Sequence, residues 1–314
     1  MKTRITELLG IQYPVIQGAM AWISDADLAA AVGNAGGAGV IATGGRSSDW
    51  VRNEIRRAKT LTDKPFGVNL MLMAPNKDEV LEIICEEQVA FATLGAGNPV
   101  PYIEPLHQAG VKVIPVVPSV KLAKRVEAAG VDALVIEGME AGGHIGQQTT
   151  MALLSNVLPE ISIPVIAAGS IVDGRGIAAA LLMGADGVQM GSRFLLAEEC
   201  NVHPNMKQAI IQATDTDSIV TGYSHNYGVR GLRNAFTEHY LERECAGAPR
   251  EELSALSKGT NRLAAVDGDM ENGMIQCGQG LNRLTHISPA QTILTELMAE
   301  TETTLLRAAA ILSR

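Results

Sequence analysis

The sequence has 314 residues, of which 46% are hydrophobic and 19% charged, and its formal net charge is -9. This composition is typical of a globular protein, and the negative charge argues against a general nucleic-acid binder. The four cysteines form no CxxC pair, which indicates reduced thiols rather than a disulfide framework or a zinc site: Cys85, Cys200, Cys245 and Cys277.

No apolar segment of the sequence suits a membrane. The first ten residues lack the apolar run of a signal peptide. No later stretch approaches the roughly 20 apolar residues that a membrane span requires. We therefore expect a cytoplasmic protein without a membrane partner.

Eight short apolar runs, rich in valine and isoleucine, occur along the first two thirds of the chain. In order they are Pro14–Gln17, Gly39–Ala42, Phe66–Leu70, Phe91–Leu94, Val111–Val117, Asp132–Ile136, Pro164–Ala168 and Gly187–Met190. Because the runs do not alternate with polar residues, they indicate parallel strands that are buried on both faces. Their starts recur about every 25 residues, as in a closed barrel of βα units.

Segments with helical character separate the runs. They include Asp25–Asn34, Asp49–Thr60, Lys77–Gln88, Val120–Ala129 and Gly174–Met183. The pattern predicts the α/β class and a (β/α)8 TIM barrel. A doubly wound open sheet is the alternative, but it normally carries a glycine fingerprint after its first strand. The residues after the first run, Gly18–Trp22, do not match that fingerprint.

The repeating pattern stops near residue 197, which predicts a further small domain. We expect the barrel over residues 1–197, a cap or substrate domain over 198–287, and a helix over 288–314 that packs back on the barrel. The helices expected in the last two parts are Asn205–Ala213, Val229–Cys245, Glu251–Leu256 and Ser288–Ser313. Ser288-Pro289 is a favourable start for the last of them.

The ends of the seventh and eighth runs combine glycine with a hydroxyl, in Ala168-Gly169-Ser170 and Gly191-Ser192. In barrels of this kind phosphate often binds after strands seven and eight, where backbone N–H groups are accessible. The two turns predict a phosphate site, and tight βα turns are the alternative explanation. Small residues such as Ala19 at other strand ends leave room for a flat ring. Asn69, a lone amide in an apolar run, is either a ring contact or a satisfied core amide.

The connection after the sixth run, Glu137–Gly146, contains His144 framed by three glycines. Imidazole carries protons near neutral pH, and catalytic groups concentrate on such loops. We interpret His144 as catalytic because helix or strand packing does not account for it. Glu137 and Glu140 are either a catalytic carboxylate pair or, as we favour, one residue that orients its neighbours and one that is solvated.

With these residues identified, the sequence resembles enoyl-[acyl-carrier-protein] reductase II, within the wider nitronate monooxygenase (2-nitropropane dioxygenase-like) family of FMN flavoproteins. The matching stretches include MKTRITELLGIQYPVIQGAMAW, DKPFGVNLMLM, EGMEAGGHIGQQTTM, IPVIAAGSIVDGRG and GADGVQMGSRF. They cover the barrel and continue more loosely through VDGDMENGMIQCGQ. The AGGH loop is common to the family, and the longer EGMEAGGHIG followed by TTM is more similar to the reductases.

The resemblance implies bound FMN, NADH as electron donor with NADPH as the alternative, and a trans-2-enoyl thioester on acyl carrier protein as substrate in fatty acid biosynthesis. It implies that His144 is catalytic and that the protein is a homodimer. The positions expected to bind the flavin are Ala19, Met20, Asn69, Glu137, Gly138, Ala168, Gly169, Ser170, Gly191, Ser192 and Gln279.

Acyl carrier protein is acidic, so its binding by this acidic chain requires a local basic patch. One candidate is the helix that carries Arg52, Arg56, Arg57 and Lys59, and another is the pair Arg230 and Arg233. A solvated helix face is the alternative explanation for each set.

Three other functions are compatible with parts of the sequence. A nitronate monooxygenase would use the same flavin and histidine but oxidise alkyl nitronates with oxygen. A flavin-free isomerase or aldolase of phosphorylated sugars would require a lysine or a carboxylate pair at the barrel mouth, and no strand end carries a lysine. A non-catalytic flavin-binding sensor would not need the histidine loop.

Overall fold

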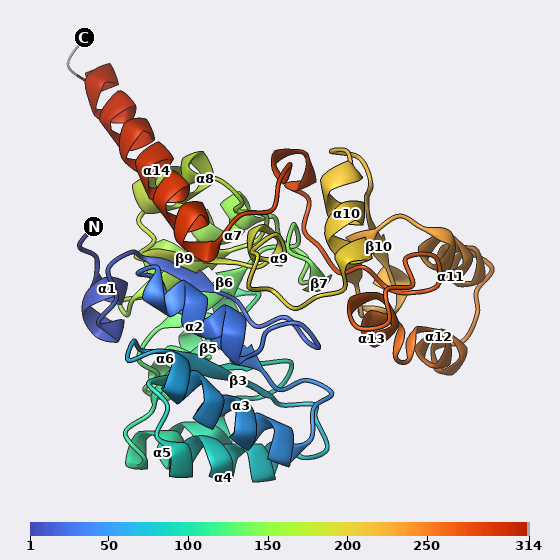
Figure 1. The fold of residues 1–314 in the computed structure, drawn as a ribbon, viewed down its shortest axis with the longest axis horizontal. Coiled ribbons are helices and arrows are strands. Elements are labelled where there is room, and N and C mark those ends of the chain that lie inside the picture. Colours follow the sequence, from blue (N-terminus) through green and yellow to red (C-terminus); the bar gives the residue numbers. More distant parts are fainter. Residues whose placement is uncertain (313–314) are drawn as a thin grey trace.

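The computed structural model describes residues 1–312, and parallel strands form a barrel at its centre (Figure 1). The strands are β1 (Val15–Gln17), β2 (Val40–Ala42), β3 (Gly67–Met71), β4 (Phe91–Gly95), β5 (Lys112–Val117), β6 (Leu134–Glu137), β8 (Val165–Ala168) and β9 (Gly187–Met190). Their order in the sheet is β1-β9-β8-β6-β5-β4-β3-β2. Each overlaps the apolar run predicted for it, so the (β/α)8 barrel is confirmed.

The side chain of Gln17 helps to close the barrel between β1 and β2. These strands meet only through an isolated bridge between Ile16 and Ala38. The Gln17 side-chain Oε1 accepts a hydrogen bond from the N–H of Val40 at 3.1 Å, and its Nε2 donates to Ser24 Oγ at 2.9 Å. Since Gln17 is fully buried, these bonds satisfy groups that would otherwise be costly to remove from water.

Helices between the strands cover the outside of the barrel. They are α2 (Ala26–Asn34), α3 (Ser48–Leu61), α4 (Lys77–Glu87), α5 (Val100–Gln108), α6 (Val120–Ala128), α7 (Thr150–Val157), the 3-10 turn η1 (Leu158–Glu160) and α8 (Gly174–Met183). All five helices predicted here are present. Side-chain oxygens of Asp25, Ser47, Ser119 and Asp173 accept first-turn N–H groups, and these caps fix where the preceding loops end.

Inward-facing side chains fill the barrel from its N-terminal end. On β4, Phe91 is buried in the same cluster as Ile16, whereas Thr93, two residues further along the strand, lines the cavity at the C-terminal end. Helix α1 (Arg4–Leu9) covers the N-terminal end, since Ile5 and Leu9 are buried in the Phe91 cluster. The barrel therefore offers space for a ligand at the C-terminal ends of its strands.

The short helix α9 (Ser192–Leu195) follows β9 within the predicted barrel segment. The segment predicted as a cap, residues 198–287, contains α10 (Pro204–Gln212), β10 (Ser218–Thr221), η2 (Tyr223–His225), β11 (Val229–Leu232), α11 (Ala235–Cys245), α12 (Arg250–Ser257), α13 (Thr260–Ala265) and η3 (Leu281–Arg283). The prediction of one helix over residues 229–245 is wrong for its first residues, because α11 begins only at Ala235. Residues 229–232 pair antiparallel with β10 and with β7 (Gly143–His144) of the histidine loop. Asn234 then caps α11 through a capping box with Thr237.

The last helix, α14 (Ala290–Leu312), packs on α8 and α2 of the barrel and extends beyond it (Figure 1). Its first N–H, that of Ala290, donates to the carboxylate of Glu199 at 2.9 Å. The helix was predicted from Ser288 to Ser313. It begins two residues later, and Ser313 lies outside the described residues.

Within residues 1–312 no helix is long and apolar enough to cross a membrane. The four cysteines are free thiols, as predicted.

Candidate active site at the barrel mouth

A cavity of about 470 Å³ lies at the C-terminal ends of the barrel strands. The strands, the histidine loop and the cap segment Gln276–Gly278 all contribute to its wall. The predicted site residues that line it are Ala19, Met20, Asn69, Glu137, His144, Ala168, Gly169, Ser170, Gly191 and Ser192. Residues from seven parts of the chain therefore converge on a single cavity of the size usual for small-molecule sites.

Two predicted residues, Gly138 and Gln279, lie behind this wall. Gly138 is buried against Thr150, whose Oγ1 and backbone would collide with any Cβ at that position. The side chain of Gln279 is exposed, and its N–H donates to the carbonyl of Glu140 at 3.0 Å. Neither residue lines the cavity, and their part in flavin binding stays a prediction.

Polar side chains from four strands line the cavity at inward-facing positions: Asn69, Thr93, Glu137 and Gln189. The Nδ2 of Asn69 donates to Thr93 Oγ1 at 3.1 Å and to its carbonyl at 3.3 Å. Asn69 is therefore held by its neighbour and also lines the cavity. This polar ring gives a bound molecule hydrogen-bonding partners in an otherwise apolar barrel.

The two glutamates of the histidine loop have different surroundings. Burial raises the pKa of Glu137 to about 7, which makes its carboxyl ready to exchange a proton near neutral pH. Glu140 accepts hydrogen bonds from the N–H and the hydroxyl of Thr150, the first residue of α7. Glu140 therefore orients its neighbours, as favoured above. Glu137 is half-buried and faces the cavity, and desolvation there sets its pKa.

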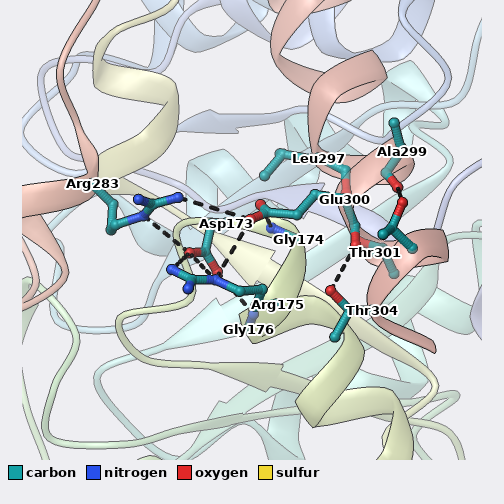
Figure 2. A network of polar contacts seen from close by, with 11 residues as sticks. Asp173, Gly174, Arg175, Gly176, Arg283, Leu297, Ala299, Glu300, Thr301 and Thr304 are labelled. Atoms are coloured by element: carbon teal, nitrogen blue, oxygen red, sulfur yellow. Dashed lines mark hydrogen bonds and ion pairs between the residues drawn. The ribbon is translucent and has the colours of Figure 1, made fainter. Parts of the chain in front are cut away.

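The turns after β8 and β9 differ in how much of their backbone is available to an anion. At the start of α8, the N–H of Gly174 donates to Glu300 of α14 at 2.8 Å, and that of Gly176 to Asp173 at 2.9 Å (Figure 2). Two carboxylates therefore occupy this helix end. By contrast, α9 begins after Gly191 with no side-chain cap. The start of α8 is therefore not available to an anion, and the two predicted phosphate turns, Gly169-Ser170 and Gly191-Ser192, stay a prediction.

The sequence led us to expect His144 on a loop without strand packing, and this expectation is wrong. It belongs to β7 and pairs with Val229 of β11, so strand packing does account for its backbone. Its imidazole lines the cavity and meets the ring of Tyr227 edge to face, with centroids 4.6 Å apart. The side chain of His144 is exposed, and the desolvation that remains lowers its pKa, which favours the neutral imidazole at pH 7.

Several cavity residues were not predicted. The parallel register pairs Asn69 with Thr93, and the alternation of side chains along β9 places Gln189 inward, so a strict period of two could have identified both. Gln276 and Cys277 come from a glycine-rich segment without a helix or strand. Local sequence carries no signal for them.

Neither candidate basic patch is free. On α3, the side chains of Arg52, Arg56 and Lys59 all bind the carboxylate of Glu87, and Arg57 binds Asp27. In the cap, Arg230 is buried, and its Nε donates to the carbonyl of Met139 at 2.9 Å. Arg233 is exposed, 3.9 Å from Glu238. Most of these side chains are thus paired with acids or, like Arg230, buried, and a docking surface for acyl carrier protein stays a prediction.

The fold and the cavity together define a (β/α)8-barrel protein with a small-molecule cavity at the C-terminal ends of its strands, lined by a histidine and a desolvated carboxyl group. The family model described as nitronate monooxygenase matches residues 2–81 and 76–300. The chain belongs to the nitronate monooxygenase family of oxidoreductases.

Solved structures of the same fold include one of FabK from Thermotoga maritima. It is 42% identical to this chain, with a TM-score of 0.96 over 99% of both chains. A nitroalkane oxidase from Streptomyces ansochromogenes is 28% identical, with a TM-score of 0.85 over 98% of this chain and 100% of the other.

Relatives of similar sequence carry two different names. A 5-hydroxy-7a-methyl-1-oxo-octahydro-1H-indene-4-carboxyl-CoA dehydrogenase of Rhodococcus jostii is 36% identical over 90% of this chain and 79% of its own length. A probable nitronate monooxygenase of Staphylococcus aureus is 33% identical over 95% of this chain and 96% of its own length.

Proposed function

We propose that this protein is an FMN-dependent reductase that uses NADH to reduce the trans-2 double bond of an enoyl thioester carried by acyl carrier protein. The observation that carries the proposal is the likeness to FabK, an enoyl-[acyl-carrier-protein] reductase II, over 99% of both chains. The name of the Rhodococcus relative, which contains a carboxyl-CoA group, also supports a thioester substrate.

The cavity residues fit a flavin mononucleotide. The phosphate would meet the turns at Gly169-Ser170 and Gly191-Ser192, where glycine and an uncapped helix start leave N–H groups for an anion. Small residues, such as Ala19, leave room for the ring across the mouth. Asn69 and Glu137 would supply hydrogen bonds to its polar atoms.

Bound FMN would supply the two-electron chemistry, taking a hydride from NADH and giving it to the β-carbon of the enoyl thioester. The protein must then deliver one proton to the α-carbon and hold the thioester carbonyl. His144 lies on the cavity wall and is the residue that we assign to this proton delivery. The raised pKa of Glu137 makes it a second group able to hold a proton at neutral pH.

An anaerobic titration tests this function. Purified protein reconstituted with FMN should lose its yellow absorbance on addition of NADH, and crotonyl thioester should restore it. Crotonyl groups on acyl carrier protein and on CoA should be compared, because the thioester carrier is the part of the proposal with the least structural support. Failure of both thioesters to reoxidise the flavin would contradict the proposal.

The competing function is nitronate oxidation, which the family model and the Staphylococcus relative favour. It predicts that an alkyl nitronate alone bleaches the flavin and that oxygen restores the colour.

NADPH should be tested beside NADH as the electron donor of the proposed reductase. A homodimer in the cytoplasm is the assembly and location that we propose for the reductase.

A further inference from the structure

A tight turn of the cap contacts the candidate catalytic histidine. The turn spans residues 222–228 and joins β10 to β11. It carries Tyr227, whose ring meets the imidazole of His144 with centroids 4.6 Å apart and planes at 74°. An edge-to-face contact of this kind restricts the rotation of both rings.

The backbone of the same turn is joined to the histidine loop. Val229, at the end of the turn, pairs with His144 across β11 and β7. The N–H of Ile145 donates to the carbonyl of Gly228 at 3.0 Å. The position of the imidazole is therefore fixed twice by one cap segment, through its backbone and through the ring of Tyr227.

Glu244 of α11 holds the turn from its other side. One carboxylate oxygen accepts the N–H of Gly222 at 2.8 Å, and the other accepts the N–H and hydroxyl of Ser224 at 2.9 and 2.5 Å. The turn closes on itself, since the N–H of Tyr227 donates to the carbonyl of Gly222 at 3.1 Å. Gly222 has a φ of +74°, which glycine adopts without strain.

We propose that Tyr227 is a positioning residue that holds the His144 imidazole in its reactive orientation, and that Glu244 fixes Tyr227 in place. The inference rests on the proposed role of His144 in proton delivery. Tyr227 is 39% exposed, so its ring does not belong to the buried core of the cap. The contact uses the ring rather than the hydroxyl, which makes phenylalanine a conservative replacement.

The test compares Tyr227→Ala with Tyr227→Phe, and Tyr223→Ala serves as the matched control. Tyr223 lies in the same turn and is 50% exposed. We expect Tyr227→Ala to slow reoxidation of the reduced flavin by crotonyl thioester about 10- to 100-fold, because small displacements of a reacting group carry costs of this order. Reduction by NADH and flavin content should stay unchanged. Tyr227→Phe and Tyr223→Ala should behave like the wild type.

A second readout does not depend on turnover. NMR titration of histidine-labelled protein, with the His144 signal assigned by its loss in His144→Ala, reports the pKa of the imidazole. The imidazole is already exposed, and removal of the Tyr227 ring takes away part of the protein that still desolvates it, so its lowered pKa should rise toward the ordinary value of 6.5 in Tyr227→Ala. It should not rise in Tyr227→Phe. Glu244→Ala keeps the tyrosine ring in the chain but removes the hydrogen bonds that hold the turn. This variant should therefore raise the imidazole pKa by an intermediate amount.

Two results would overturn the inference. One is an unchanged imidazole pKa and reoxidation rate in Tyr227→Ala. The other is a Phe variant as slow as the Ala variant, which would assign the effect to the hydroxyl. If wild-type protein is not reoxidised by any enoyl thioester, the proposed function fails, whereas the imidazole titration still decides whether Tyr227 positions His144.

Discussion

The carboxylate of Glu300 on α14 accepts a hydrogen bond from the N–H of Gly174, the first residue of α8, at 2.8 Å (Figure 2). Gly174 permits this approach, because a Cβ there would lie 2.5 Å from the carbonyl of Leu297 and the N–H of Thr301. The C-terminal helix thus caps a barrel helix directly beside the proposed phosphate turn. Arg175 and Arg283 pair with Glu300 and Asp173 around the same point.

Loss of this cap should destabilise the protein. We expect Glu300→Ala to lower the free energy of unfolding by about 1–2 kcal/mol, the usual effect of removing a helix N-terminal acceptor. Glu302→Ala is the control, because Glu302 is an exposed acid two residues further along the same helix. This variant should change stability little. Denaturant titration of both variants makes the comparison, and equal stabilities would contradict the structural role of Glu300.

Two glycines at the end of β4 and just beyond it, Gly95 and Gly97, should respond differently to alanine. A Cβ at Gly97 would lie 2.6 Å from the Cβ of the buried Leu72, whereas a Cβ at Gly95 would meet nothing within 4 Å. Gly97→Ala should therefore lower the thermal midpoint by several degrees, consistent with an overpacking cost of about 1–3 kcal/mol. Gly95→Ala should leave it nearly unchanged. A thermal unfolding series in which Gly95→Ala is the less stable variant would contradict this geometry.

Glu137 should make the flavin-free protein less stable as the pH rises. Its folded pKa of about 7 lies above the ordinary value of 4.5, so the folded state holds a proton that the unfolded state releases between these values. The contribution of Glu137 to stability is present below pH 4.5 and is lost as the pH approaches 7, by at most about 3 kcal/mol. Glu137→Gln, which cannot ionise, should flatten this part of the pH–stability curve. An unchanged slope would mean that Glu137 ionises normally.

His144→Ala should separate the two halves of the proposed reaction. Flavin content and reduction by NADH should persist, while reoxidation by enoyl thioester falls about 100- to 10,000-fold, the range for loss of a general acid. Desolvation lowers the wild-type pKa of His144, so the protonated imidazole becomes abundant only below about pH 6.5. If this protonated ring delivers the proton to the substrate, reoxidation should become faster as the pH falls below that value. The variant should lack this pH dependence. Stopped-flow absorbance at several pH values measures both effects, and a variant with normal reoxidation would remove His144 from the mechanism.

Local sequence patterns were sufficient for the barrel. Each apolar run became a parallel strand, because a strand buried on both faces must be apolar throughout its length. The helix over Gly174–Met183 was predicted with the bounds that it has, since Asp173 and Gly184 supply an N-cap and a left-handed end. The small residues at strand ends also identified most of the cavity wall.

The segment Val229–Leu232 illustrates where local patterns fail. Its residues suit either a helix or a strand, and it pairs with the histidine loop 85 residues earlier in the register Val229 to His144. Propensity is a weak predictor when a distant partner decides the pairing. The same holds for the basic side chains of α3, which pair with acids from neighbouring helices, among them Glu86 and Glu87 of α4 and Asp27 of α2.

By itself, then, the sequence determined the barrel, the glycine-bearing turns at its mouth and the presence of His144 among them, because buried strands and tight turns restrict which residues they accept. Only the tertiary structure decided that Tyr227 of the cap contacts this histidine, that Glu300 closes the start of α8, and that burial raises the pKa of Glu137. These features depend on contacts between residues far apart in the chain and on the exclusion of water that follows from them, and neither is encoded by local spacing.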